Sequence, residues 1–187
     1  MVCIAGSKRI RILILVCLLV SLPGCLGRSP ARQVTVPSYI ARAALDAALS
    51  VTGAPYLWGG RGPDRFDCSG LITWAYKKAM GKDEIFLVGN QRTTDANIYD
   101  LWRFNVELLP PEAAVPGDIV FITNTDERIT HGGLFIRWLD EEKTIFEFIN
   151  ASAYIEYEAV VIDCWPVEGL KRDQWFVGIG RLKVLAE

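Results

Sequence analysis

The sequence predicts an α+β protein in which helices come first and pack on a small antiparallel β-sheet that follows. Apolar residues recur at helical spacing in two segments of the first half, and after Pro116-Gly117 short apolar runs alternate with turn residues. The chain of 187 residues is 51% hydrophobic, which excludes a disordered or collagen-like protein and fits one domain with a leader. With a net charge of −2, the chain lacks the excess of basic residues that is typical of nucleic-acid-binding proteins, so we expect no nucleic-acid partner.

The N-terminal segment has the pattern of a bacterial export signal. A basic cluster precedes an apolar run over residues 12–20. A run of roughly 9 residues suits a signal-peptide core but falls short of the roughly 18 needed to cross a bilayer. The Leu-Pro-Gly-Cys sequence that ends at Cys25 resembles the lipobox of lipoproteins. The resemblance implies a signal peptide over residues 1–24, then a lipidated Cys25 and a short tether over residues 25–36. An uncleaved membrane anchor is the alternative.

The same segment predicts the location of the protein. A lipid-anchored domain would lie in the cell envelope, and Leu26 stands where some bacteria use Asp to hold lipoproteins at the inner membrane. We therefore expect an outer-membrane anchor with the domain facing the periplasm. Without the leader, Cys68 and Cys164 are the thiols that remain beyond the lipidated residue. An oxidising envelope could join them in a disulfide, unless Cys68 serves as a nucleophile.

The folded domain is expected to occupy residues 37–187. Its first helix is predicted over residues 38–51, with Ser38 as the N-cap, and its second over residues 68–80, where a glycine follows. Residues 54–63 between them are dense in Gly and Pro and must form a loop.

The second half of the domain is predicted to be β-structure, after a partly helical connection over residues 82–113. An acidic turn at residues 140–143 joins two of its strands. The predicted strands cover residues 118–122, 133–138, 144–150, 160–162 and 176–184.

Cys68 stands in the first turn of the second helix, in the sequence Asp67-Cys68-Ser69-Gly70. Unpaired N–H groups and the helix dipole favour a thiolate there and lower the pKa of the thiol. Asp67 can cap the same helix, and the Gly-rich loop before it lets a ligand approach the backbone closely. A small buried residue is the alternative interpretation of this cysteine.

His131 is the single histidine of the chain and directly precedes a predicted strand. One His and two thiols argue against a zinc site, and no H-E-x-x-H, Walker or G-x-G-x-x-G sequence is present, so we expect no metal and no cofactor. A cysteine and a histidine together indicate a nucleophile and its general base. A surface or satisfied core histidine is the alternative.

Hairpin geometry supplies a candidate for the third residue that usually orients the imidazole. If Glu141-Glu142 form the turn, the two strands pair so that Gly133 lies opposite Asn150. His131 and Asn150 then share one face as diagonal neighbours within side-chain reach, whereas a slip of one residue would separate them. Asn150 is therefore the candidate, and a strand-end Asn is the alternative.

Five motifs come in the order that is typical of one enzyme family. They are Tyr56-Leu57-Trp58-Gly59-Gly60, Phe66-Asp67-Cys68-Ser69-Gly70-Leu71, Pro116-Gly117-Asp118, His131-Gly132-Gly133-Leu134 and Phe148-Ile149-Asn150-Ala151-Ser152. Together they resemble the NlpC-type cell-wall cysteine peptidases of bacteria over residues 37–187. The resemblance implies a papain-like fold.

The resemblance also implies what each residue does. Cys68 would attack a peptide carbonyl to form an acyl-enzyme, with His131 as general base and Asn150, where the family most often has His, orienting the imidazole. Tyr56 matches a tyrosine that lines the family's active site and assists the oxyanion. The implied substrate is the stem peptide of peptidoglycan, often cut between D-glutamate and a diamino acid. An N-acetylmuramoyl-L-alanine amidase and a non-catalytic murein-binding lipoprotein remain alternatives.

Overall fold

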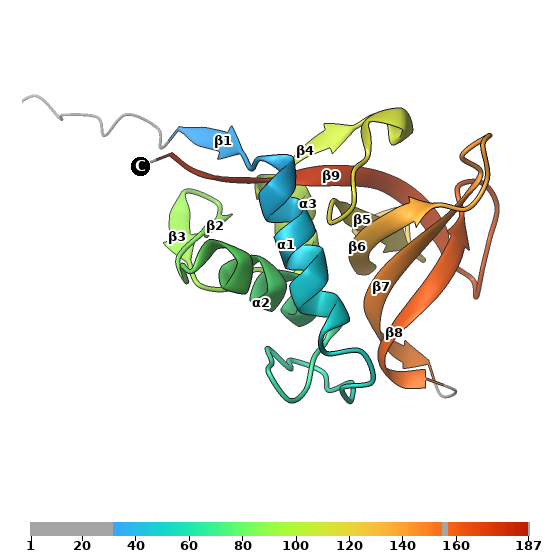
Figure 1. Ribbon diagram of the computed structural model, residues 1–187, viewed down its shortest axis with the longest axis horizontal. Helices are drawn as coiled ribbons and strands as arrows, with labels where there is room; N and C mark the ends of the chain where they lie inside the picture. Colours follow the sequence, from blue (N-terminus) through green and yellow to red (C-terminus); the bar gives the residue numbers. More distant parts are fainter. Residues whose placement is uncertain (1–31, 155–156, 187) are drawn as a thin grey trace, which may run out of the picture.

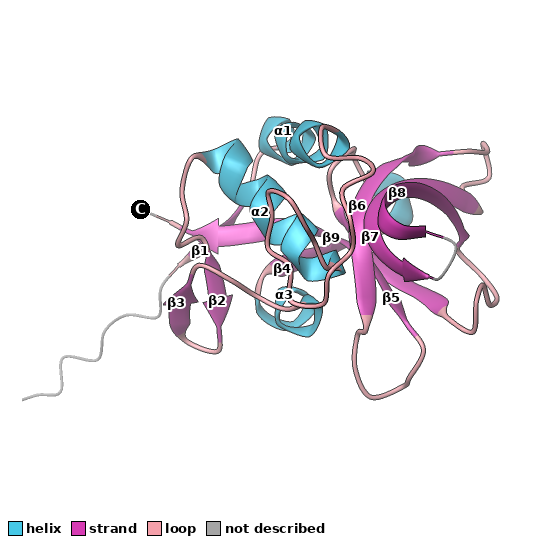
Figure 2. Ribbon diagram, turned by 90° about the horizontal axis from the view of Figure 1, so that it is seen from below, coloured by secondary structure: helices cyan, strands magenta, loops and turns pink. Residues whose placement is uncertain are grey.

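The computed structural model describes residues 32–154 and 157–186, and the predicted leader and lipidation site at Cys25 lie outside them. The helices α1 (Ser38–Leu49), α2 (Cys68–Met80) and α3 (Ile98–Phe104) gather at one end of the molecule, and curved strands form the other end (Figure 1, Figure 2). The predicted α+β class is confirmed. Among the described residues, no helix has the length and apolar character needed to span a membrane.

One antiparallel sheet organises the molecule. Within the described part of the chain it has seven strands, in the order β1-β9-β5-β6-β7-β8, with β4 paired to β9 as well. The long strand β9 reaches from the curved end of the sheet to β1 beside the helices (Figure 1). The strands are β1 (Gln33–Thr35), β4 (Val106–Leu109), β5 (Ile119–Thr123), β6 (His131–Trp138), β7 (Ile145–Tyr154), β8 (Tyr157–Pro166) and β9 (Trp175–Leu185). A separate hairpin consists of β2 (Phe86–Val88) and β3 (Gln91–Thr93), and a short 3-10 turn is η1 (Pro111–Ala113).

The two main helices lie close to their predicted positions. The helix α2 has the predicted bounds, and Gly81 ends it with a left-handed backbone, φ 63°. The helix α1 begins at Ser38 and ends two residues before the predicted end. The prediction that Ser38 is the N-cap is wrong, because the extended residue Pro37 occupies that position and no side chain caps the helix.

Short strands are the elements that the sequence patterns did not reveal. Besides α3, the connection over residues 82–113 contains β2, β3 and β4, each only three or four residues long. Strands of this length are too short for a period of two to become visible. Part of the predicted tether also forms β1, which pairs with the end of β9. The folded part therefore begins before Pro37.

A buried ion pair fixes the start of β5 to the rest of the fold. Asp118 is fully buried, and its two oxygens accept hydrogen bonds from Nε and Nη2 of Arg181 on β9, both at 2.9 Å. The same carboxylate accepts the N–H of Val115 at 2.8 Å. One residue earlier, the carbonyl of Gly117 accepts the hydroxyl of Tyr76 from α2 at 2.8 Å. Helix and sheet are thus joined at this turn.

We expect Asp118→Ala to lower the free energy of unfolding by about 3 kcal/mol or more, because Arg181 would remain largely buried without its counter-charge. Urea denaturation followed by tryptophan fluorescence measures this change. The matched control is Glu147→Ala, which breaks the more exposed pair with Arg137 and should cost less than about 1 kcal/mol. Equal costs for the two variants would contradict the assignment.

Candidate active site

Cys68 opens α2 at the point where the Gly-rich loop, the helix and the sheet meet. Asp67 is the N-cap of α2, and its Oδ1 accepts the N–H of Gly70 at 2.6 Å and the hydroxyl of Ser69 at 2.9 Å. The sulfur lies among the backbone N–H groups of Ser69, Gly132 and Cys68 itself. Because Gly132 belongs to β6, the start of the helix and the start of this strand meet at the thiol.

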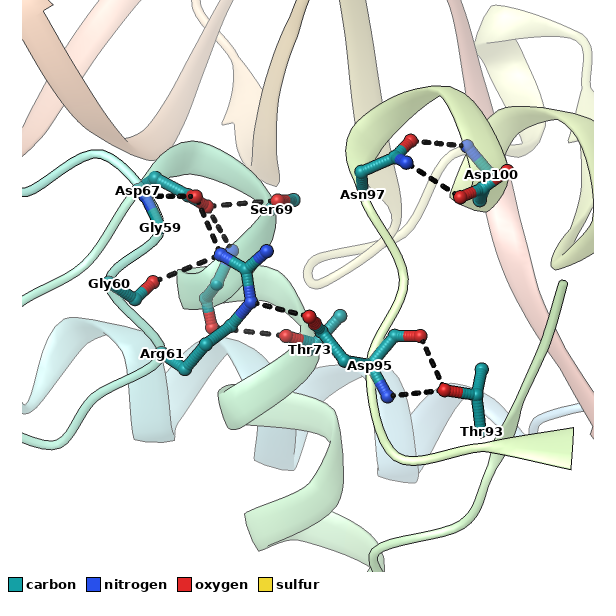
Figure 3. A network of polar contacts seen from close by, with 11 residues as sticks. Gly59, Gly60, Arg61, Asp67, Ser69, Thr73, Thr93, Asp95, Asn97 and Asp100 are labelled. Atoms are coloured by element: carbon teal, nitrogen blue, oxygen red, sulfur yellow. Dashed lines mark hydrogen bonds and ion pairs between the residues drawn. The ribbon is translucent and has the colours of Figure 1, made fainter.

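A polar network holds the Gly-rich loop against the helix (Figure 3). The second oxygen of Asp67 accepts hydrogen bonds from the N–H of Gly59 at 3.0 Å and from Nη1 of Arg61 at 2.6 Å. Nε of Arg61 donates to Asp95, between β3 and α3, at 2.8 Å. Neither Arg61 nor Asp95 is among the site residues predicted from the sequence. An arginine inside a Gly-rich loop was the available signal, since a half-buried guanidinium needs a carboxylate partner.

The loop approaches α2 so closely that residue 70 has no room for a side chain. A Cβ on Gly70 would lie 1.9 Å from the carbonyl oxygen of Gly60. That carbonyl accepts the N–H of Asp67 at 3.0 Å. Each residue of the Asp-Cys-Ser-Gly motif therefore has its own role. The aspartate caps the helix, the cysteine supplies the thiol, the serine donates a hydrogen bond to the cap, and the glycine leaves space for the loop.

The hairpin of β6 and β7 brings His131 and Asn150 together. Leu134 pairs with Ile149, which is the predicted register, and Nε2 of His131 lies 3.1 Å from Oδ1 of Asn150. Asn150 is buried, whereas His131 is half-buried. The predicted juxtaposition of these two side chains is confirmed.

The turn of this hairpin differs from the prediction. The N–H of Leu139 donates to the carbonyl of Ile145 at 2.9 Å. The predicted Glu141-Glu142 turn places Leu139 opposite Thr144, so the connection contains one residue more than predicted. A bulge in β6, between Phe135 and Arg137, takes up the extra residue. The two departures offset each other, and the predicted register returns near the site.

Cys68, His131 and Asn150 line one pocket of about 300 Å³. Tyr56 lines it too, and the pKa of its hydroxyl is raised by burial first and by the nearby Cys68 and Asp67 second. A larger hollow of about 560 Å³ beside α3 holds none of the predicted site residues. The structure therefore collects four predicted residues in one place.

Burial decides the protonation of the thiol and the imidazole. Burial, together with the charge of Asp67, raises the pKa of the Cys68 thiol to about 12, against the opposing effect of the surrounding N–H groups. It also lowers the pKa of His131, an effect that the hydrogen bond to Asn150 partly offsets. The expectation that the helix start lowers the pKa of Cys68 is wrong, because loss of water outweighs the N–H groups. The resting pair is a thiol and a neutral imidazole.

Cys164 does not line this pocket. It is exposed on β8, with its sulfur 3.8 Å from Nζ of Lys171, and both it and Cys68 are free thiols. The alternative of a disulfide between Cys68 and Cys164 is wrong for this structure. Within residues 32–154 and 157–186, no group of three His, Cys, Asp or Glu side chains could hold a metal ion.

Comparison with known proteins points to one family. The model of the NlpC/P60 family matches residues 53–168. A protein of Corynebacterium glutamicum named probable endopeptidase is 46% identical over 54 residues, which are 29% of this chain and 25% of that protein. The bifunctional muramidase/DL-endopeptidase CwlT of Bacillus subtilis is 34% identical over 92 residues, 48% of this chain and 24% of that protein. The chain thus spans a quarter or less of these relatives.

Solved structures share the fold. The structure of NlpC1 from Trichomonas vaginalis has a TM-score of 0.53 and 22% identity, over 81% of this chain and 47% of that one. A Staphylococcus aureus protein described as similar to a lipoprotein of the NLP/P60 family has a TM-score of 0.51 and 23% identity, over 86% of this chain and 45% of that one. These likenesses confirm the papain-like arrangement of helices and antiparallel sheet.

We expect Asp67→Asn to speed the alkylation of Cys68 by iodoacetamide at neutral pH by about 3- to 10-fold. The amide oxygen can still cap α2, and the amide nitrogen replaces the oxygen that accepts from Gly59 and Arg61. The negative charge that raises the pKa of the thiol is gone, and up to about one pKa unit changes the thiolate fraction by this factor. Mass spectrometry of the peptide that contains Cys68 gives the rate. Asp95→Asn removes the other carboxylate bound to Arg61 and should leave the rate unchanged. The same acceleration in both variants would disprove a direct effect of the charge at residue 67.

Proposed function

Since the chain belongs to the NlpC/P60 family, we propose that it is a peptidoglycan hydrolase, a cysteine endopeptidase that cuts murein stem peptides. One observation carries the proposal. The hydrogen-bonded pair of His131 and Asn150 lies in the pocket that contains the thiol of Cys68. In this proposal, the thiol is the nucleophile, the imidazole is the base and the amide orients the imidazole, which are the three parts of a cysteine-peptidase site.

The hydrogen bond assigns the proton on the imidazole. Oδ1 of Asn150 can only accept, so Nε2 of His131 carries hydrogen and Nδ1 is the basic nitrogen. In the proposed reaction Nδ1 takes the proton of Cys68 as the sulfur bonds to the scissile carbonyl carbon. The imidazolium then protonates the leaving amine, and water releases the acyl group. The N–H of Cys68 and the hydroxyl of Tyr56 are the proposed donors to the oxyanion.

The bond that we propose lies between D-glutamate and the diamino acid of the stem peptide. A DL-endopeptidase and a gamma-DL-glutamyl hydrolase of Bacillus subtilis, both 34% identical over the matched segments, support this choice. Lipid attachment at Cys25 in the outer membrane, which we also propose, would place the pocket beside this polymer. An amidase and a binding-only lipoprotein are the competing assignments.

We expect Cys68→Ala to reduce cleavage of purified peptidoglycan fragments by about 1000-fold or more, because the variant lacks the nucleophile of the proposed acyl-enzyme. Product masses identify the bond. The matched control is Cys164→Ser, which removes the exposed thiol on β8 and should retain full activity. Release of whole stem peptides from glycan would indicate an amidase instead. Fragments that bind without being cut by the wild type would indicate the binding-only protein.

The pH profile of kcat/KM tests the role of Asn150. Burial lowers the pKa of His131, and the base must be neutral, so activity should persist below pH 6.5 and fall as pH drops through that lowered pKa. Asn150→Ala removes the hydrogen bond that raises this pKa, so the fall should move to lower pH and kcat should drop about 10-fold or more. Asn150→Asp adds a negative charge and should move the fall to higher pH. A profile that neither variant shifts would exclude Asn150 as the orienting group.

A further inference from the structure

A charged cluster that the catalytic mechanism does not use lies on the wall of the active-site pocket. Asp163 on β8 forms ion pairs with two basic side chains, with 2.8 Å between its Oδ1 and Nζ of Lys171 and 2.6 Å between its Oδ2 and Nη1 of Arg172. Burial acts to raise the pKa of Asp163, but the two cations hold it below its ordinary value, so the carboxylate is ionised. Two cations and one carboxylate leave the cluster with an excess of positive charge.

Arg172 is the member of this cluster with donors to spare. It lines the pocket together with Cys68 and His131, and its side chain is 26% exposed. A guanidinium has five N–H groups, and among the described residues only Asp163 receives a hydrogen bond from this one. The group lies over the ring of Tyr154, 4.7 Å from its centroid. Arg172 is therefore held in place, and most of its N–H groups have no acceptor among the described residues.

The backbone at Arg172 has a conformation that is unusual for a residue other than glycine. Arg172 and Asp173 both have left-handed backbones, with φ 54° and 57°, at the centre of a tight turn closed by hydrogen bonds between Lys171 and Gln174. Asn and Gly are the residues that such turns favour. The hydroxyl of Tyr154 donates to the carbonyl of Arg172 at 3.0 Å and fixes this conformation. Strain of this kind concentrates at ligand-binding sites.

We propose that Arg172 binds a free carboxylate of the substrate peptide and makes the enzyme select acidic over amidated stem peptides. The proposal rests on the proposed function, which supplies a substrate whose D-glutamate and diamino acid carry carboxylates. Arginine pairs with a carboxylate through two parallel N–H bonds, a geometry that an amide cannot match. Arg172 lines the same pocket as Cys68 and His131, so a carboxylate bound to it would lie in the pocket of the reacting groups. Asp163 is a positioning residue that orients the guanidinium.

The test uses synthetic stem peptides in matched pairs, in which one carboxylate at a time is replaced by a carboxamide. For one of these carboxylates we expect the wild type to prefer the acid by about 10- to 100-fold in kcat/KM, the usual effect of a charged hydrogen bond. Arg172→Gly should remove this preference by slowing the acid alone, and Arg172→Lys should keep part of it. Glycine suits the left-handed backbone, so the turn should still form. Arg137→Ala, which removes an exposed arginine paired with a carboxylate on the same sheet, should keep the full preference.

Binding of the same peptides to Cys68→Ala and to the Cys68→Ala, Arg172→Gly double variant, measured by calorimetry, tests the proposal without catalysis. Tighter binding of the acid that depends on Arg172 supports it, even if the wild type cuts none of the peptides and the proposed function fails. The proposal is overturned if acid and amide bind equally, if neither binds, or if Arg172→Gly keeps the preference. Cleavage by the wild type without any preference would overturn this inference alone and leave the proposed function intact.

Discussion

The Asp67 carboxylate is the interaction on which the geometry of the site depends. One oxygen satisfies the first turn of α2 and the other binds the Gly-rich loop and Arg61, so a single group fixes the positions of both the thiol and the loop that borders the pocket. Without it, the orphan N–H groups at the helix start would need other partners, and the backbone hydrogen bond from Asp67 to the carbonyl of Gly60 would be left to join loop and helix there. The same charge raises the pKa of Cys68. The carboxylate that fixes the position of the thiol therefore also makes the thiolate harder to form.

The base is positioned by a different layer of the fold. His131 and Asn150 meet because β6 and β7 are in register, and that register depends on space at Gly133, where a Cβ would lie 2.2 Å from the carbonyl oxygen of Ile149. Helix and sheet then meet at the N–H of Gly132, beside the sulfur. The thiol is held by α2 and the imidazole by the sheet. Their relative position is consequently a property of the packing between the two layers, which the buried pair of Asp118 and Arg181 helps to secure.

The sequence predicts what is encoded locally. Helix bounds, the cap at Asp67 and the pairing of His131 with Asn150 follow from periodicity, capping and strand register, together with a motif order that identifies the family. The strands β2, β3 and β4 stay hidden because three or four residues carry no periodic signal. Arg61 and Asp95 are far apart in the chain, and so are the paired strands β4 and β9. Contacts between such distant segments become visible only in the three-dimensional structure. The direction of the Cys68 pKa was mispredicted for the same reason: the helix dipole is local, but burial is a property of the whole fold.

A neutral thiol beside a neutral imidazole raises the question of what promotes proton transfer. Burial disfavours each charged form separately, whereas a thiolate and an imidazolium formed together stabilise each other. The negative charge of Asp163 raises the pKa of His131, and the positive charge of Arg172 lowers it. A substrate carboxylate bound to Arg172 would offset the lowering effect of Arg172 and leave the raising effect of Asp163. The imidazole would then become more basic when the proposed substrate is in place, so recognition and proton transfer would be coupled through the charges on one wall of the pocket.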